Sequence, residues 1–130
     1  MTTFVFDTGA LSLIYAEDTR LRPVLEKIQS GSADGLVSAV TLSEFYYKTC
    51  HTFGKVVATL RSRQVSERMQ IIQAGAELSV AAGLEKCRNH RFSLADAFVL
   101  ALALDVKGTL LTTDGELAKE RGTEVRYLAV

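Results

Sequence analysis

The chain has 130 residues, 48% of them hydrophobic, and its 15 basic residues balance 15 acidic ones. This length and composition predict a single globular domain over residues 1–130 and exclude a largely disordered chain. The sequence has no apolar run long enough to span a bilayer and no secretory signal, so we expect a cytoplasmic protein without a membrane partner.

Strand and helix patterns alternate from the start of the sequence. Phe4–Phe6 is a short aromatic and β-branched run that predicts a buried strand, and a helix is expected directly after it over residues 10–16. Apolar residues at helical spacing predict a second helix over residues 20–28. A polar loop over residues 29–35 and a short strand over residues 36–38 are expected next.

The next helix is predicted from a capping motif. Thr41-Leu42-Ser43-Glu44 has the spacing of a capping box, and Gly54 is expected to end the helix that follows it. Another helix is predicted over residues 55–65, a third strand over residues 69–73 and a further helix over residues 77–87.

A second capping motif precedes the most apolar helix of the chain. Ser93-Leu94-Ala95-Asp96 repeats the spacing with aspartate in place of glutamate, and the helix is predicted over residues 94–106. A strand over residues 109–113, a short helix over residues 116–121 and a last strand over residues 124–128 complete the chain. This alternation predicts an α/β fold whose mostly parallel sheet is covered by helices on both faces.

Four acids are expected at one edge of this sheet. Asp7 and Asp114 directly follow strands, and the carboxyl ends of parallel strands meet at a single edge. Glu44 is expected in the first turn of a helix that begins at this edge. The helix headed by Asp96 runs back to the amino edge, so Asp96 is expected at the carboxyl edge as well.

Helix capping is the simpler explanation for each acid taken alone, because carboxylates are favoured at helix amino termini. Taken together, four carboxylates repel one another. Two charges about 4 Å apart cost about 4 kcal/mol at an effective dielectric of 20, whereas a helix dipole returns roughly 0.3–1 kcal/mol. A divalent cation would remove this cost, and oxygen ligands suit Mg²⁺ or Mn²⁺.

Such a metal site supports hydrolysis of phosphodiesters without a protein nucleophile. Thr112 and Thr113 place hydroxyl groups beside Asp114, and strand alternation sends them to opposite faces. We expect Thr112 to be the one that points into the site.

The motifs that carry these acids resemble those of the PIN-domain ribonucleases. The similar segments follow one another in the family's order: Val5-Phe6-Asp7-Thr8-Gly9-Ala10-Leu11, Val37-Ser38 with Ser43-Glu44-Phe45, Ser93-Leu94-Ala95-Asp96-Ala97, and Leu111-Thr112-Thr113-Asp114. The short chain is similar to the toxins of VapBC toxin–antitoxin modules. This resemblance implies a three-layer α/β/α sandwich around a five-stranded, mostly parallel sheet.

The resemblance also implies an activity and partners. It implies an endoribonuclease that depends on Mg²⁺ (or Mn²⁺), acts on RNA, forms a homodimer and is inhibited by a cognate antitoxin protein. The family's acidic ligands fall on Asp7, Glu44, Asp96 and Asp114, and its hydroxyl position falls on Thr112. Two alternatives stay open: a PIN fold that binds RNA or protein without cutting, and a PIN nuclease that works outside a toxin pair.

Two basic segments and one apolar pair of helices are further candidate surfaces. The basic segments are candidates for binding RNA phosphates, although for the individual residues a solvated loop is the preferred explanation. The helix pair is expected to supply mostly core residues, with a possible dimer face or antitoxin groove. The first basic segment contains Lys86, Arg88, His90 and Arg91, and the second contains Lys55, Arg61, Arg63 and Arg68. The helix pair contributes Phe45, Tyr46, Tyr47, Phe53, Val56, Val57 and Leu60.

Overall fold

Five parallel strands form the central sheet of the computed structural model, which describes residues 1–130. They are β1 (Thr2–Phe6), β2 (Ala33–Ser38), β3 (Gln70–Ile72), β4 (Thr109–Thr112) and β5 (Glu124–Tyr127). The order is β3-β2-β1-β4-β5, and every neighbouring pair is parallel. The predicted parallel sheet is therefore confirmed, and β1 ends in the middle of its carboxyl edge.

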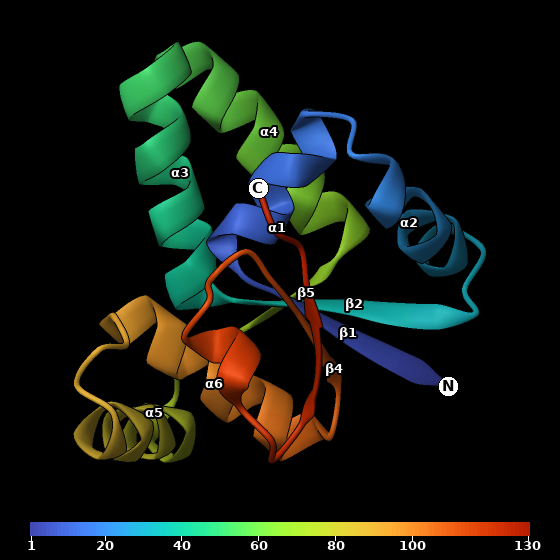
Figure 1. Cartoon of the computed structure of the whole chain (residues 1–130). Helices are drawn as coiled ribbons and strands as arrows, with labels where there is room; N and C mark the ends of the chain where they lie inside the picture. Colours follow the sequence, from blue (N-terminus) through green and yellow to red (C-terminus); the bar gives the residue numbers. More distant parts are fainter.

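Six helices cover the two faces of the sheet. They are α1 (Thr8–Tyr15), α2 (Arg22–Gln29), α3 (Ala39–Phe53), α4 (Lys55–Arg68), α5 (Ala76–Arg88) and α6 (Leu94–Val106). Figure 1 shows α1 to α4 on one side of the sheet and α5 with α6 on the other. This arrangement confirms the predicted three-layer α/β/α sandwich. None of the helices is long and apolar enough to cross a membrane.

Alternation along β1 divides the core into two layers. Phe4 and Phe6 are buried in a cluster with Phe45 of α3, whereas Val5 belongs to a second cluster with Val99 of α6. Most residues of α6 are buried, as its nearly continuous apolar sequence predicts. The two layers hold β1 from both faces, so its carboxyl end is a rigid place for a functional side chain.

Element boundaries differ from the prediction most clearly at β2 and in the segment after β4. β2 begins at Ala33, so part of the predicted loop over residues 29–35 is strand. Within β2, Gly35 leaves room for the side chain of Ile28, because a Cβ at position 35 would approach Cδ1 of Ile28 to 2.8 Å. The short helix predicted over residues 116–121 is only a single 3-10 turn, η2 (Leu117–Lys119).

Candidate metal centre

Asp7 lies at the centre of the site, directly after β1. It caps α1: its Oδ1 accepts a hydrogen bond of 2.7 Å from the backbone N–H of Ala10. Its Oδ2 accepts hydrogen bonds from the Thr112 hydroxyl and from the N–H of Thr113, the latter at 3.2 Å. The carboxylate is 4% exposed, so its position is fixed by three donors from two elements.

Thr112 and Thr113 contact the site in different ways. Thr112 is fully buried behind Asp7, where its hydroxyl donates to Asp7 and accepts from the N–H of Asp114 at 2.9 Å. Thr113 lines the cavity in front of the acids instead. Thr113 thus lines the cavity, whereas the Thr112 hydroxyl reaches the site through its hydrogen bond to Asp7.

Glu44 reaches the site from the second turn of α3, not from the first. Ser38 is the N-cap of this helix and accepts from Val40 N–H, so the predicted capping box from Thr41 to Glu44 does not form. The Thr41 hydroxyl is buried without a hydrogen-bond partner. Glu44 Oε1 instead accepts a hydrogen bond from the Thr8 hydroxyl at the start of α1.

Asp96 does form the capping box that its sequence predicts. Its backbone N–H donates to the Ser93 hydroxyl at 3.0 Å, and its Oδ2 accepts from Ser93 N–H at 3.1 Å. Oδ1 is left without a donor from the chain. Capping therefore occupies one oxygen of Asp96 and leaves the other for a ligand.

Asp114 caps the turn that follows β4. Its Oδ1 accepts from the N–H groups of Glu116 and Leu117 at 2.7 and 3.2 Å. Its other oxygen has no hydrogen-bond donor. Asp114 thus repeats the arrangement of Asp96, with one oxygen held by backbone and one free.

All four acids line one cavity of about 120 Å³ at the carboxyl edge of the sheet. The lining is completed by Thr8, Gly9, Lys48, Ala95, Val99 and Thr113. Gly9 is required by close packing, because a Cβ at this position would lie 1.8 Å from the Thr113 hydroxyl oxygen. The cavity is strongly negative, since Lys48 is the single basic residue among its lining residues.

The pKa values of Asp7 and Asp96 are both shifted by their surroundings. Burial raises the pKa of Asp7, hydrogen bonds from Thr112 and two backbone amides oppose the rise, and the charge of Asp96 adds to it. Burial also raises the pKa of Asp96, its hydrogen bonds with Ser93 oppose the rise, and Asp114 and Glu44 add to it. Ionising all four carboxylates is therefore costly without a positive partner.

The donor set fits a hard divalent cation. Every candidate ligand is a carboxylate oxygen, and Glu44, Asp96 and Asp114 each keep one oxygen free of hydrogen bonds. The side chains are spread around the cavity, and no three of them lie close enough together to hold an ion as placed. The residues that would hold Mg²⁺ or Mn²⁺ are the four acids predicted from sequence.

Besides the four acids, six residues line the cavity, and four of these are polar or glycine: Thr8, Gly9, Lys48 and Thr113. Thr8 and Gly9 follow Asp7 directly, and their adjacency to a strand-end acid was the available signal. Lys48 follows Glu44 by four residues, which places both on one face of α3. Thr113 was considered beside Thr112 but not chosen, because the pairing of β4 with β1 and β5, which decides the face of each residue, is not visible in the sequence.

The two basic segments lie outside this cavity. Arg88 pairs with Glu85, Arg91 pairs with Glu116, and Lys86 donates to the carbonyl of Phe92 at 2.6 Å. These contacts favour a structural role for the loop between α5 and α6. In α4, the Arg61 guanidinium lies 4.7 Å from the ring centroids of both Tyr15 and Phe53.

Comparisons with known sequences and structures identify the proteins that this chain resembles. The sequence model of the PIN domain matches residues 4–121. No curated protein matches the sequence. A chain of VapBC2 from Rickettsia felis, solved bound to a DNA fragment from its promoter, superposes with a TM-score of 0.74 at 14% identity over 98% of this chain and 99% of that chain.

Two further structures are similar to this one. A chain of DNA-bound VapBC from Salmonella typhimurium gives a TM-score of 0.73 at 15% identity, over 98% of each chain. VapC20 of Mycobacterium tuberculosis, described as a sarcin-ricin loop cleaving toxin, gives 0.69 at 20% identity over 90% of this chain and 93% of that chain. At these identities the likeness concerns the fold alone, and the match over residues 4–121 shows that the chain belongs to the PIN-domain family.

Proposed function

We propose that this protein is an endoribonuclease that depends on Mg²⁺ or Mn²⁺ and hydrolyses RNA phosphodiester bonds. The observation that carries the proposal is the convergence of Asp7, Glu44, Asp96 and Asp114 on one cavity, three of them with a free oxygen. A bound divalent cation would supply Lewis acidity and neutralise charge on the phosphate. No nucleophilic side chain is required.

The residues of the chain prepare the site for this chemistry. Thr112 fixes the orientation of Asp7, and Thr8 fixes that of Glu44. Ser93 holds Asp96 through the capping box. Hydrogen bonds of this kind, one layer behind the ligands, set ligand geometry and metal affinity.

We further propose that the nuclease is the toxin of a type II toxin–antitoxin pair, with a cognate antitoxin and a homodimeric state. The similar structures from Rickettsia felis and Salmonella typhimurium are both VapBC complexes, which supports an antitoxin partner. Exposed apolar side chains at Tyr47, Phe53 and Val56 offer surface for such contacts.

Cleavage of total RNA by the purified protein with Mg²⁺ tests the activity. Asp7→Asn and Asp96→Asn are expected to abolish cleavage while the circular dichroism spectrum stays unchanged. Equal cleavage by wild type and variants would overturn the assignment. Coexpression with the product of an adjoining short reading frame tests the pair: growth arrest relieved by that product supports it, and harmless expression of an active nuclease contradicts it.

A further inference from the structure

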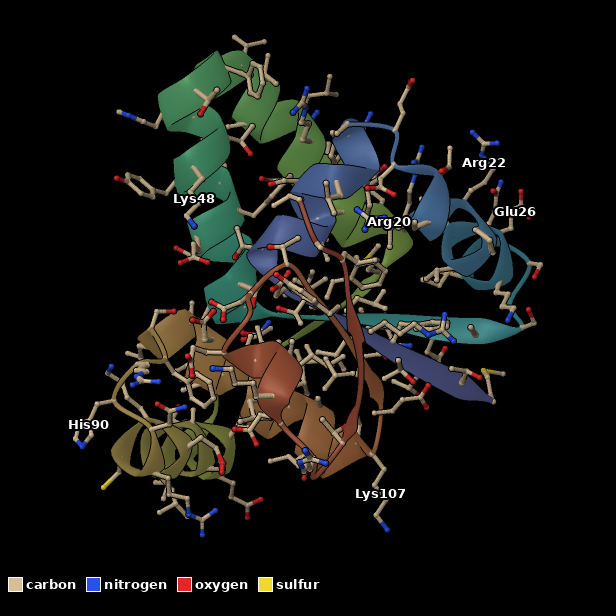
Figure 2. The ribbon with its side chains drawn as sticks, viewed as in Figure 1. Arg20, Arg22, Glu26, Lys48, His90 and Lys107 are labelled. Carbon is tan, nitrogen blue, oxygen red and sulfur yellow. The ribbon has the colours of Figure 1, made fainter.

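Lys48 lines the acidic cavity, and the proposed binding of a metal ion by the four acids does not explain why a lysine lies there. It lies on α3, one turn beyond Glu44, and is the single basic residue lining the cavity. Figure 2 shows its side chain on the flank of α3. A cation is thus built into the rim of a strongly acidic site.

The ammonium group of Lys48 is not engaged by the protein. The four ion pairs of the chain involve Asp18, Glu85 and Glu116, and none involves Lys48. Glu44 lies at the favourable spacing for a helical ion pair, yet its carboxylate is bonded to Thr8 instead. Lys48 is therefore free to bind an anion from outside.

Other basic side chains near this edge are already engaged. Arg91 and Lys119 both pair with Glu116, at 3.4 and 3.2 Å, and Lys86 donates to a backbone carbonyl. Recruiting them for RNA would require those contacts to break. Lys48 alone combines a place in the cavity with an unpaired charge.

An RNA backbone needs such a charge at this point. The phosphates that flank the scissile bond carry full negative charges and approach four carboxylates, which repel them. Neutralisation of a phosphate by lysine supplies affinity that falls with added salt. Lysine suits this task because its ammonium group is a compact point charge with three donors.

We propose that Lys48 binds a backbone phosphate of the RNA beside the scissile bond and so positions the substrate over the acids. The proposal rests on the proposed nuclease function and assigns Lys48 as a positioning residue. If Lys48 only formed a helical ion pair with Glu44, its removal would not be expected to weaken RNA binding. That ion pair is absent from the structure.

Lys107 supplies a matched control. It is exposed, lies at the opposite edge of the sheet where α6 passes into β4, and makes no side-chain contact with an acid. Figure 2 shows it far from Lys48. Lys48→Gln and Lys107→Gln make the same substitution and remove the same charge at two exposed positions.

Binding of a fluorescent single-stranded oligoribonucleotide is measured by anisotropy with Mg²⁺ over a salt series, in the Asp7→Asn background so that the RNA stays intact. Lys48→Gln is expected to weaken binding roughly tenfold and to reduce the salt slope by about 0.7, the value for one phosphate contact on a single strand. Lys107→Gln should match its parent. Equal losses for both variants, or no measurable binding by the parent, would overturn the proposal.

Kinetics in the otherwise unchanged protein separate this proposal from the proposed function. Lys48→Gln should raise KM roughly tenfold with kcat little changed, and Lys48→Arg should recover most of the loss because it keeps the charge. Cleavage that ignores Lys48 would remove the proposal and leave the nuclease standing. RNA binding that depends on Lys48, without cleavage by the wild type, would retain Lys48 and remove the nuclease.

Discussion

The starts of α3 and α6 carry the same motif spacing and yet form different structures. At α6, Ser93 and Asp96 bond each other's backbone and complete a capping box. At α3, the helix begins three residues earlier under Ser38, so Thr41 is left without a partner and Glu44 bonds Thr8. The difference shows that an acid in a capping motif can serve the fold, the site, or both.

Among the variants that test this difference between α3 and α6, those that remove the carboxylate of Glu44 or Asp96 should lower the cleavage activity most. Glu44→Gln and Asp96→Asn should each lower kcat for RNA cleavage on the order of 100-fold or more, because each removes a proposed metal ligand. Steady-state cleavage assays at saturating Mg²⁺ measure this. If Asp96 served only the capping box, Asp96→Asn would stay active, since the amide oxygen of asparagine can also accept the hydrogen bond from Ser93 N–H.

Loss of the Thr8 hydroxyl should have the next largest effect. Thr8→Val leaves Glu44 without its hydrogen bond, and loss of such a supporting contact weakens metal affinity roughly 10- to 100-fold. Calorimetric titration with Mn²⁺ measures the affinity. Thr8→Ser keeps the hydroxyl and serves as the control; equal affinity for both variants would show that Thr8 does not hold Glu44 in place.

The two helix starts should differ in their contribution to stability. Ser93→Ala removes a working cap and should lower the free energy of unfolding by about 1 kcal/mol. Thr41→Val removes a buried hydroxyl that has no partner, so it should be neutral or stabilising. Urea denaturation of both variants compares them. A larger loss at Thr41 than at Ser93 would contradict the assigned helix starts.

The smallest expected effect is a pH-dependent rise in the melting temperature of the Asp96→Asn variant in the absence of metal. The pKa of Asp96 is raised in the folded protein, so its carboxyl favours folding below pH 3.8 and loses that contribution as the pH rises through the folded value. At pH 7 with EDTA, the variant should melt a few °C higher, a shift typical of about 1 kcal/mol or less.

The gain in melting temperature should shrink towards zero as the pH falls below 3.8, where the Asp96 carboxyl is protonated in both the folded and the unfolded state. Mg²⁺ should reverse the order, because an ion that binds only the folded acids stabilises the wild type. A variant that melts lower than wild type in EDTA at pH 7 would argue against repulsion among the four acids.

The sequence was sufficient for the layers of the fold and for the edge at which the acids gather. Strand–helix alternation predicts the parallel sheet, and the short link from α6 to β4 places Asp96 at the same edge as Asp7. These inferences depend on connection lengths, which a sequence displays directly. They do not require side-chain packing.

Local competition between neighbouring residues was not predictable in this way. Ser38, Thr41 and Ser93 are all acceptable N-caps, and the choice at α3 depends on β2 running without a loop into the helix. Which of Thr112 and Thr113 lines the cavity likewise depends on the register of β4 between its two partners. Tertiary contacts determine these outcomes, so a spacing rule applied to one segment cannot predict them.

Anomalous diffraction from crystals soaked in Mn²⁺ tests the central claim most directly. The account predicts one or two anomalous peaks inside the cavity lined by Asp7, Glu44, Asp96 and Asp114, with carboxylate oxygens about 2.1 Å away. The peaks should vanish in Asp96→Asn crystals. Wild-type crystals with no peak in this cavity at millimolar Mn²⁺ would contradict the claim that these four acids form a metal centre.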